Sequence, residues 1–396
     1  MNPASRSRAR KLLFRLGGIA VGLFVGLVLV EGALRATGIG SGPIISKRRL
    51  VDDSKPSVAY HCYPTNPHSE FGPAPEIEGG NWRLETYTLD PQEIPLKRLH
   101  ETPWCVRYDF SSRRLRDREY PLEPAEGVLR IAVVGDSFVF GEGVPNQQSL
   151  PRQIHDLLGA EFEVLNGGLV GADTIREYEL AALLAGQAHC TRIVFVFIPN
   201  DVPLTDELIK RQNGINDLIN FRSAGLVTYE ADAWYSGRLR TVQLIGRRLF
   251  LRRIRQETIQ WYVDSYDPRY NGENLAVLDQ TLHALANLPD CRVAFVIYPL
   301  LEGLESGYPL SAIHERVAAM ARRAGLPVLD LAEFFDGLSP RELWFHPVAH
   351  HPNGAAHAVA ARAIVDWLHS DVPGFLSTQT EDAGNNRPSQ NPTKSP

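Results

Sequence analysis

Between residues 130 and 331, short apolar runs alternate with patterns of helical length, and this alternation limits the possible folds more than any other feature of the sequence. Five runs are rich in valine, isoleucine and phenylalanine: residues 130–136, 163–166, 192–198, 292–299 and 327–331. Such runs are typical of strands buried on both faces. Helical patterns occupy residues 149–160, 174–186, 274–288 and 311–325. The sequence therefore predicts an α/β protein whose five-stranded parallel sheet carries helices on both faces.

An apolar segment near the N-terminus follows a group of basic residues: Arg6, Arg8, Arg10, Lys11 and Arg15. The uncharged run at 16–30 spans only about 22 Å as a helix, short of the roughly 30 Å hydrocarbon core. We expect a transmembrane helix through residues 12–34, with Arg15 and Glu31 extending to the headgroups. A cleaved signal peptide is the alternative, although ALRA at 33–36 is a poor cleavage site. The basic end predicts a cytoplasmic N-terminus at the inner membrane, with the remaining chain on the periplasmic or extracytoplasmic side.

The overall composition excludes several classes of protein. With 44% hydrophobic residues and no strict glycine period, the chain is neither disordered nor collagen-like. A net charge of -5 and the lack of a long basic stripe argue against nucleic acid as a partner. Cys62, Cys105, Cys190 and Cys291 are too few for a disulfide scaffold, and no C-x-x-C pair suggests zinc. One or two disulfides in an oxidising compartment, or four buried thiols, fit this pattern.

Changes in composition divide the chain into four parts. Residues 1–37 form the basic end and the anchor. Residues 38–127 are rich in proline, glycine, tyrosine and charge, and we expect them to form an extension packed on the core. Residues 128–370 hold the alternating pattern, interrupted by a helical insertion at 202–273. Residues 371–396 lack a core-forming pattern, which predicts a disordered tail.

The insertion carries a dense cluster of arginines. Seven lie between Arg238 and Arg255, interleaved with leucine, isoleucine and phenylalanine at roughly helical spacing. A basic amphipathic helix of this kind suits anionic lipid or an acidic polysaccharide. The alternative is the solvated face of a helix that covers the core.

A serine stands where the first predicted strand turns into a helix. The strand runs into Gly135, Asp136 and Ser137, so the serine would be exposed at the carboxyl edge of the sheet, where ligands bind. Helix N-terminal amides at such a turn can help to stabilise an oxyanion. A serine that only caps the helix is the alternative. Three further polar blocks follow in order, at 165–168, 199–201 and 350–357.

These four blocks resemble the SGNH (GDSL-like) hydrolase family over about residues 128–369. The string RIAVVGDSFVFGEGV, together with the anchor and an upstream YHCYPTNP segment, resembles the membrane-anchored bacterial members. The resemblance implies a flavodoxin-like three-layer α/β/α sandwich and an esterase or acyl-transfer activity without a cofactor. It places the nucleophile at Ser137 and the base at His351. It assigns the oxyanion hole to the backbone amides of Ser137 and Gly168 and to the side-chain amide of Asn200.

Several histidines lie close to the expected base: His346, His350, His351 and His357. Spacing of four residues can indicate a metal site on a helix. Pro347 and Pro352 prevent a continuous helix here, so that alignment is absent and we expect no metal. His357 falls within the following helix, where a structural role is expected.

Two positions depart from the family pattern. Ile198 stands where the third block usually has glycine, which leaves the asparagine donor in place. Val348 and Ala349 occupy the positions where an aspartate normally precedes the base. In Ser-His-Asp triads that aspartate orients the imidazole, and its conversion to asparagine costs about 10⁴ in kcat.

Three interpretations of the missing aspartate stay open. Ser137 and His351 work as a dyad oriented by a backbone carbonyl, or one of the nearby carboxylates Asp330, Asp336 and Glu342 takes its place. In the third, catalysis has been lost and only the pocket remains.

The leading functional hypothesis is an exported, membrane-anchored serine esterase that removes short acyl groups from a carbohydrate or lipid. Its substrate would be a small acyl ester or an acylated glycan or lipid. Transfer of the acyl group to an envelope polysaccharide is the first alternative. A catalytically silent binding module with the same fold is the second.

Overall fold

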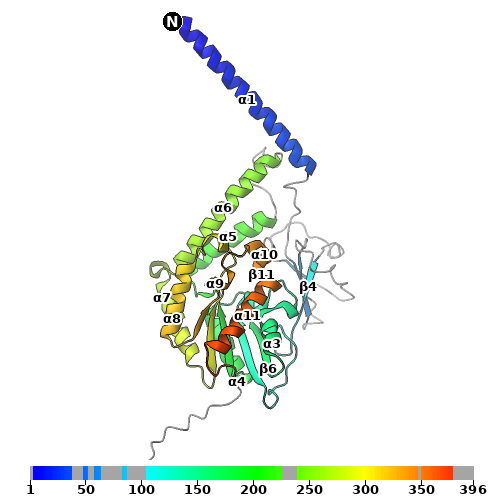
Figure 1. The fold of residues 1–396 in the computed structure, drawn as a ribbon, viewed down its shortest axis with the longest axis vertical. Coiled ribbons are helices and arrows are strands. Elements are labelled where there is room, and N and C mark those ends of the chain that lie inside the picture. The colour runs from blue at the N-terminus through cyan, green and yellow to red at the C-terminus, as the bar shows by residue number, and fades with distance from the viewer. Residues whose placement is uncertain are drawn as a thin grey trace, which may run out of the picture.

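Five parallel strands form the centre of the fold (Figure 1). Across the sheet they run β6 (Phe162–Gly168), β5 (Leu129–Gly135), β7 (Arg192–Phe197), β8 (Arg292–Ile297) and β9 (Val328–Asp330). All neighbouring pairs are parallel. Numbered along the chain, this order is 2-1-3-4-5, the flavodoxin-like order. The predicted fold class is confirmed. The computed structural model describes residues 3–37, 48–51, 58–63, 83–86, 104–224, 239–346 and 349–377.

Alternate side chains of each central strand enter two separate hydrophobic cores. On β5, Ile131 and Val133 face one core and Ala132 and Val134 face the other, all fully buried. The first core is covered by α3 (Leu150–Leu158) and α11 (Gly354–Ser370). The second is covered by α4 (Thr174–Gln187), α7 (Pro268–Ala286) and α8 (Ser311–Arg323). Burial on both faces explains the continuous apolar runs, because each fully buried valine, leucine, isoleucine or phenylalanine side chain adds about 1.5–3 kcal/mol to the free energy of unfolding.

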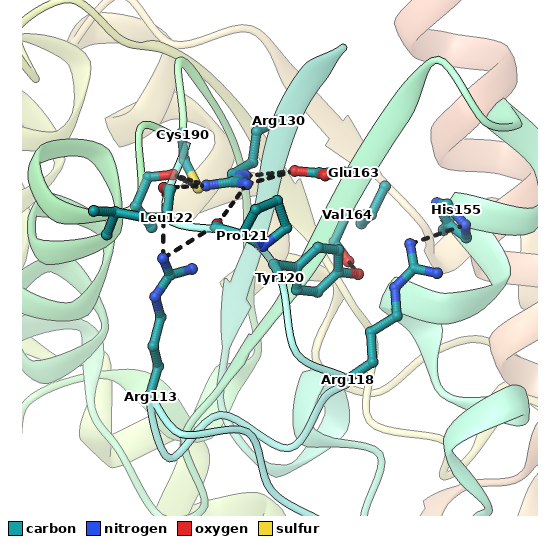
Figure 2. Close-up of polar contacts among 11 residues, drawn as sticks. Arg113, Arg118, Tyr120, Pro121, Leu122, Arg130, His155, Glu163, Val164 and Cys190 are labelled. Carbon is teal, nitrogen blue, oxygen red and sulfur yellow. Dashed lines mark hydrogen bonds and ion pairs between the residues drawn. The ribbon is translucent and has the colours of Figure 1, made fainter. Parts of the chain in front are cut away.

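A buried arginine at the start of β5 fastens the preceding segment to the sheet (Figure 2). Arg130 is 1% exposed, and its guanidinium lies 2.6 Å from the Glu163 carboxylate on β6. It also donates to the carbonyls of Pro121 and Leu122, each at 3.0 Å. The Tyr120 hydroxyl donates to a carbonyl of β6 at 2.8 Å. Because an unpaired buried charge is costly, these contacts fix the route by which the chain enters the sheet.

The N-terminal extension contains a second sheet that the sequence indicated only as short strand-like pieces. Its antiparallel strands are, in order, β3 (Arg83–Thr86), β1 (Arg48–Val51), β2 (Val58–Tyr63) and β4 (Trp104–Asp109). Cys62 on β2 and Cys105 on β4 are register partners. Their side chains and most of residues 38–103 lie outside the described residues.

The other two cysteines lie just before the starts of the neighbouring strands β7 and β8. Cys190 and Cys291 are free thiols in this structure, with the Cys291 sulfur 3.5 Å from the Cys190 carbonyl oxygen. Burial raises the pKa of both thiols to about 12, which keeps them in the unreactive thiol form.

The helical insertion consists of α5 (Asp206–Ala224) and α6 (Arg240–Ser265). The two helices pack through Trp261, whose indole donates to the Leu208 carbonyl at 3.0 Å. Arg252, Arg253 and Arg255 are exposed on α6. Arg238 and the side chains of the other arginines in the cluster lie outside the described part of the chain. A lipid or polysaccharide partner for this helix stays a prediction.

Helix α1 (Pro3–Thr37) projects from the rest of the molecule (Figure 1). Within its segment Phe14–Thr37, an 18-residue window has a mean hydropathy of 2.1, so the segment is long and apolar enough to cross a membrane, as an N-terminal signal sequence also is. Near its end, the Glu31 carboxylate accepts hydrogen bonds at 2.9 Å from the backbone N–H and the hydroxyl of Thr241 on α6. The apolar helix therefore meets the insertion directly.

The remaining elements are short and lie around the carboxyl edge of the sheet. They are α2 (Ser137–Phe140), α9 (Ala332–Phe335), α10 (Pro340–Leu343), β10 (Trp344–His346) and β11 (Ala349–Pro352), with 3-10 turns at Asn146–Gln148, Pro199–Asp201 and Leu304–Ser306. Beyond α11, Phe375 is buried in the first core, so the ordered domain continues past the expected boundary at 370. Residues 378–396 of the predicted tail lie outside the described residues.

Candidate active site

Ser137 begins α2, immediately after β5 and the turn residue Asp136. The Asp136 carboxylate caps this short helix by accepting from the Phe138 N–H at 2.8 Å. A Cβ atom at Gly135 would lie 2.6 Å from the Val196 carbonyl oxygen, so the close approach of β5 to β7 needs glycine here. These constraints place the Ser137 side chain at the carboxyl edge of the sheet, and it is 7% exposed.

His351 reaches the same point from the other end of the chain. It lies on β11, which pairs with β10 in an antiparallel hairpin. Asn353 caps α11 directly afterwards, accepting from the Ala356 N–H at 3.0 Å. The Nε2 atom of His351 lies 2.9 Å from the Ser137 Oγ, although 214 residues separate them. This distance is within the range for a base that removes the serine proton.

The two other predicted oxyanion donors lie near Ser137, and each donates to a side chain in this structure. Gly168 is the register partner of Gly135, and its N–H donates to the Asn166 side-chain oxygen at 2.9 Å. The Asn200 amide donates to the Asp136 carboxylate at 2.9 Å. To bind these two donors, an oxyanion would have to share them with the Asn166 and Asp136 side chains or displace those side chains.

Three buried carboxylates interact with one another, and the first of them directly precedes Ser137: Asp136, Glu177 and Asp201. Burial raises the pKa of Asp136, while hydrogen bonds from Asn200, Phe138 and Ser137 act in the opposite direction. Burial and the neighbouring acids raise the pKa values of Glu177 and Asp201 well above the ordinary range. For all three acids, burial disfavours the charged form.

The carboxylates that we considered as replacements for the triad aspartate are placed differently from one another. The Asp330 carboxylate accepts a hydrogen bond from Nδ1 of the buried His314 at 2.9 Å. Its histidine partner is therefore His314, where the sequence offered His351. Asp336 and Glu342 are both exposed.

A carboxylate that the sequence did not single out lies against His351 instead. Glu142 is buried, and its Oε2 lies 3.5 Å from the His351 Nε2. It lies two residues after α2, the short helix that begins at Ser137. The only signal in the sequence is an acidic residue between Gly141 and Gly143, a pattern too common to predict a site.

The remaining histidines of the block have separate environments. His350 bonds the Glu302 carboxylate at 2.5 Å and stacks on Trp344, with 3.8 Å between ring centroids. His357 is buried in α11, where burial and the charge of Arg116 lower its pKa to about 3. Among the described residues, no group of three potential metal ligands lies together, and the His346 side chain is not among them.

Comparison with known proteins gives structural matches only. No family model and no curated protein match the sequence. A G-D-S-L lipolytic protein from Desulfitobacterium hafniense is 16% identical, with a TM-score of 0.31 over 59% of this chain and 98% of that chain. The inhibitor-bound aryl esterase of M. smegmatis is 15% identical, with a TM-score of 0.34 over 61% and 99%. A two-domain esterase active on acetylated mannans is 13% identical, with a TM-score of 0.35 over 63% and 50%.

The chain's own topology is the flavodoxin-like one that the resemblance to SGNH hydrolases implies, because the 2-1-3-4-5 sheet carries the four polar blocks at its carboxyl edge. Structural matches with identities of 13–16% and TM-scores of 0.31–0.35 assign no activity to this chain. What this chain can do chemically follows from the contacts of its own side chains.

Proposed function

We propose that this protein is a serine esterase that hydrolyses short acyl esters. The observation that carries the proposal is the 2.9 Å contact between Ser137 Oγ and His351 Nε2 at the carboxyl edge of the sheet. A serine hydroxyl is a weak nucleophile at its free pKa and needs an adjacent base. The silent-module hypothesis gives no reason for this alignment.

The first half-reaction forms an acyl-enzyme. His351 Nε2 takes the hydroxyl proton while Ser137 Oγ attacks the ester carbonyl carbon. The resulting oxyanion accepts hydrogen bonds from the backbone amides of Ser137 and Gly168 and from the Asn200 side chain. In this step Gly168 exchanges its bond to Asn166 for one to the substrate. The ester C–O bond then breaks, and the departing alkoxide takes the proton from His351.

The second half-reaction restores the enzyme. Water attacks the acyl carbon and gives a proton to His351, which passes it to the Ser137 oxygen as that oxygen departs. One ester and one water therefore yield one carboxylic acid and one alcohol. Each oxyanion donor is worth about 3–4 kcal/mol in well-studied cases.

We further propose that the chain is held in the inner membrane by α1, with the active site outside the cytoplasm. The apolar segment Phe14–Thr37 and the five basic residues before or at its start support this orientation. An acylated glycan or lipid of the cell envelope is the substrate class that this location favours.

Hydrolysis of p-nitrophenyl acetate by the full-length chain in detergent tests the proposal. We expect wild-type protein to release nitrophenol and Ser137→Ala to release it at the background rate. Activity that survives in Ser137→Ala would refute the assignment of the nucleophile. A wild-type chain that neither hydrolyses esters nor reacts with a fluorophosphonate would favour the silent binding module.

A further inference from the structure

Glu142 is the buried acid beside the proposed base. Its side chain is 4% exposed, and the Oε2 atom lies 3.5 Å from the His351 Nε2. Val348 and Ala349 stand where an aspartate would serve a triad. We propose that Glu142 takes over the electrostatic task of that aspartate and stabilises the imidazolium that His351 becomes when Ser137 loses its proton. This inference rests on the proposed serine chemistry.

The loop that carries Glu142 is fixed from two sides. Arg116 is 1% exposed, and its guanidinium donates to three backbone carbonyls within residues 140–144. The Tyr108 hydroxyl accepts from the Gly143 N–H at 2.7 Å. Burial lowers the pKa of Arg116 only to about 10, so it stays charged at neutral pH. A carboxylate on such a loop is held in place and not free to turn to solvent.

Two glycines bring the loop against the strand that pairs with the His351 strand. Gly141 and Gly143 have φ angles of 78° and 90°, a backbone region that residues other than glycine rarely adopt. A Cβ atom at Gly143 would lie 2.5 Å from the Phe345 ring. Phe345 belongs to β10, the hairpin partner of β11. The approach of Glu142 to His351 therefore depends on direct packing between the loop and the hairpin.

Glu142 differs from a triad aspartate in the nitrogen that it approaches. A triad aspartate binds Nδ1 and sets the tautomer, whereas Glu142 lies beside Nε2, the atom that receives the serine proton. Opposite charges this close attract strongly where little water intervenes. Glu142 therefore acts through His351 as a positioning residue. The same attraction favours protonated His351 in the free enzyme, so it raises the pH at which the base becomes available.

Other titratable and charged groups surround the pair. Arg116 contributes a positive charge from the segment before β5, and Tyr108 contributes a hydroxyl from β4. Asp136 accepts a hydrogen bond from the Ser137 hydroxyl at 3.2 Å, together with bonds from Asn200 and from the Phe138 N–H of α2. His357 is neutral, because burial lowers its pKa to about 3. None of these groups has the 3.5 Å approach to Nε2 that Glu142 has.

The test compares Glu142→Gln with Glu315→Gln in the full-length chain, by the pH dependence of p-nitrophenyl acetate hydrolysis. Glutamine keeps the size of the side chain and removes its charge, and Glu315 is an exposed glutamate on α8. For Glu142→Gln we expect kcat to fall about 100-fold and the acid limb of kcat/KM to move to lower pH. Glu315→Gln should match wild type in both respects. Glu142→Asp, which keeps the charge at a longer separation, should move the acid limb less than Glu142→Gln does.

Two results would overturn the inference. The first is a Glu142→Gln enzyme with wild-type kcat and an unmoved acid limb. The second is a loss of activity with an unmoved limb, which would mean a structural role for the loop. If Glu142→Gln does not fold, Glu142→Asp carries the test through its kcat, which the longer charge separation should lower. An inactive wild type that no fluorophosphonate labels would instead refute the proposed function.

Discussion

Replacing Gly168 with alanine probes how closely the two halves of the proposed oxyanion site are packed. A Cβ atom at Gly168 would lie 2.0 Å from the Phe140 backbone nitrogen, whereas real Cβ atoms essentially never come within 3.0 Å of another heavy atom. β6 and α2 must therefore separate by at least 1.0 Å, the difference between those distances. Because α2 begins at Ser137, the nucleophile moves with it. A displacement of about 1 Å can cost about 10²-fold in rate, and overpacking costs about 1–3 kcal/mol of stability.

The matched control is the same substitution at Gly214, in the middle of α5. This glycine is exposed, and a Cβ atom there would meet no atom within 4 Å. Alanine should therefore stabilise the helix by about 0.5–1 kcal/mol. Urea unfolding and p-nitrophenyl acetate hydrolysis should show Gly168→Ala less stable and about 100-fold slower than wild type, and Gly214→Ala equal or better in both. Wild-type activity and stability in Gly168→Ala would refute the packing described for the site.

Two further predictions concern pH and disulfide formation. Burial raises the pKa of Asp117 from 3.8 to about 6, so the folded state binds the extra proton and stability falls as pH rises from about 4 to about 6. Relative to Asp117→Asn, wild type should lose up to about 3 kcal/mol of unfolding free energy between about pH 4 and 6, measured by urea titration. A difference between the two proteins that stays constant over this pH range would contradict the prediction. The register pairing of Cys62 with Cys105 predicts a disulfide under oxidising conditions, since paired antiparallel Cα atoms lie about 4.5–5.5 Å apart. Alkylation of the chain unfolded in denaturant without reductant should then modify Cys190 and Cys291 alone, and modification of all four would disprove the bridge.

The sequence predicted the central sheet because burial on both faces leaves a clear record. Strands such as Arg192–Phe197 and Arg292–Ile297 need an unbroken apolar run, and each run is visible without knowledge of its neighbours. The positions of Ser137 and His351 followed from strand ends and from the order of the polar blocks. Their contact could be expected once both were placed at the same edge of the sheet.

The rest of the site depends on contacts between distant segments. Glu142 becomes significant only because Arg116, in a segment without regular structure, holds its loop against the β10–β11 hairpin. Asp330 looked equally suitable in the sequence, but it pairs with His314. The N-terminal sheet was also missed as a unit, because four short strands joined by long connections give no continuous pattern.

The activation of Ser137 by His351 is the central claim, and labelling with a fluorophosphonate tests it most directly. Only an activated serine reacts quickly with such a probe, whatever the natural ester is. Mass spectrometry of the digested full-length chain should find one phosphonate on the peptide that contains Ser137, and His351→Ala should lose this label. An unlabelled wild type, or equal labelling of wild type and His351→Ala, would contradict the account.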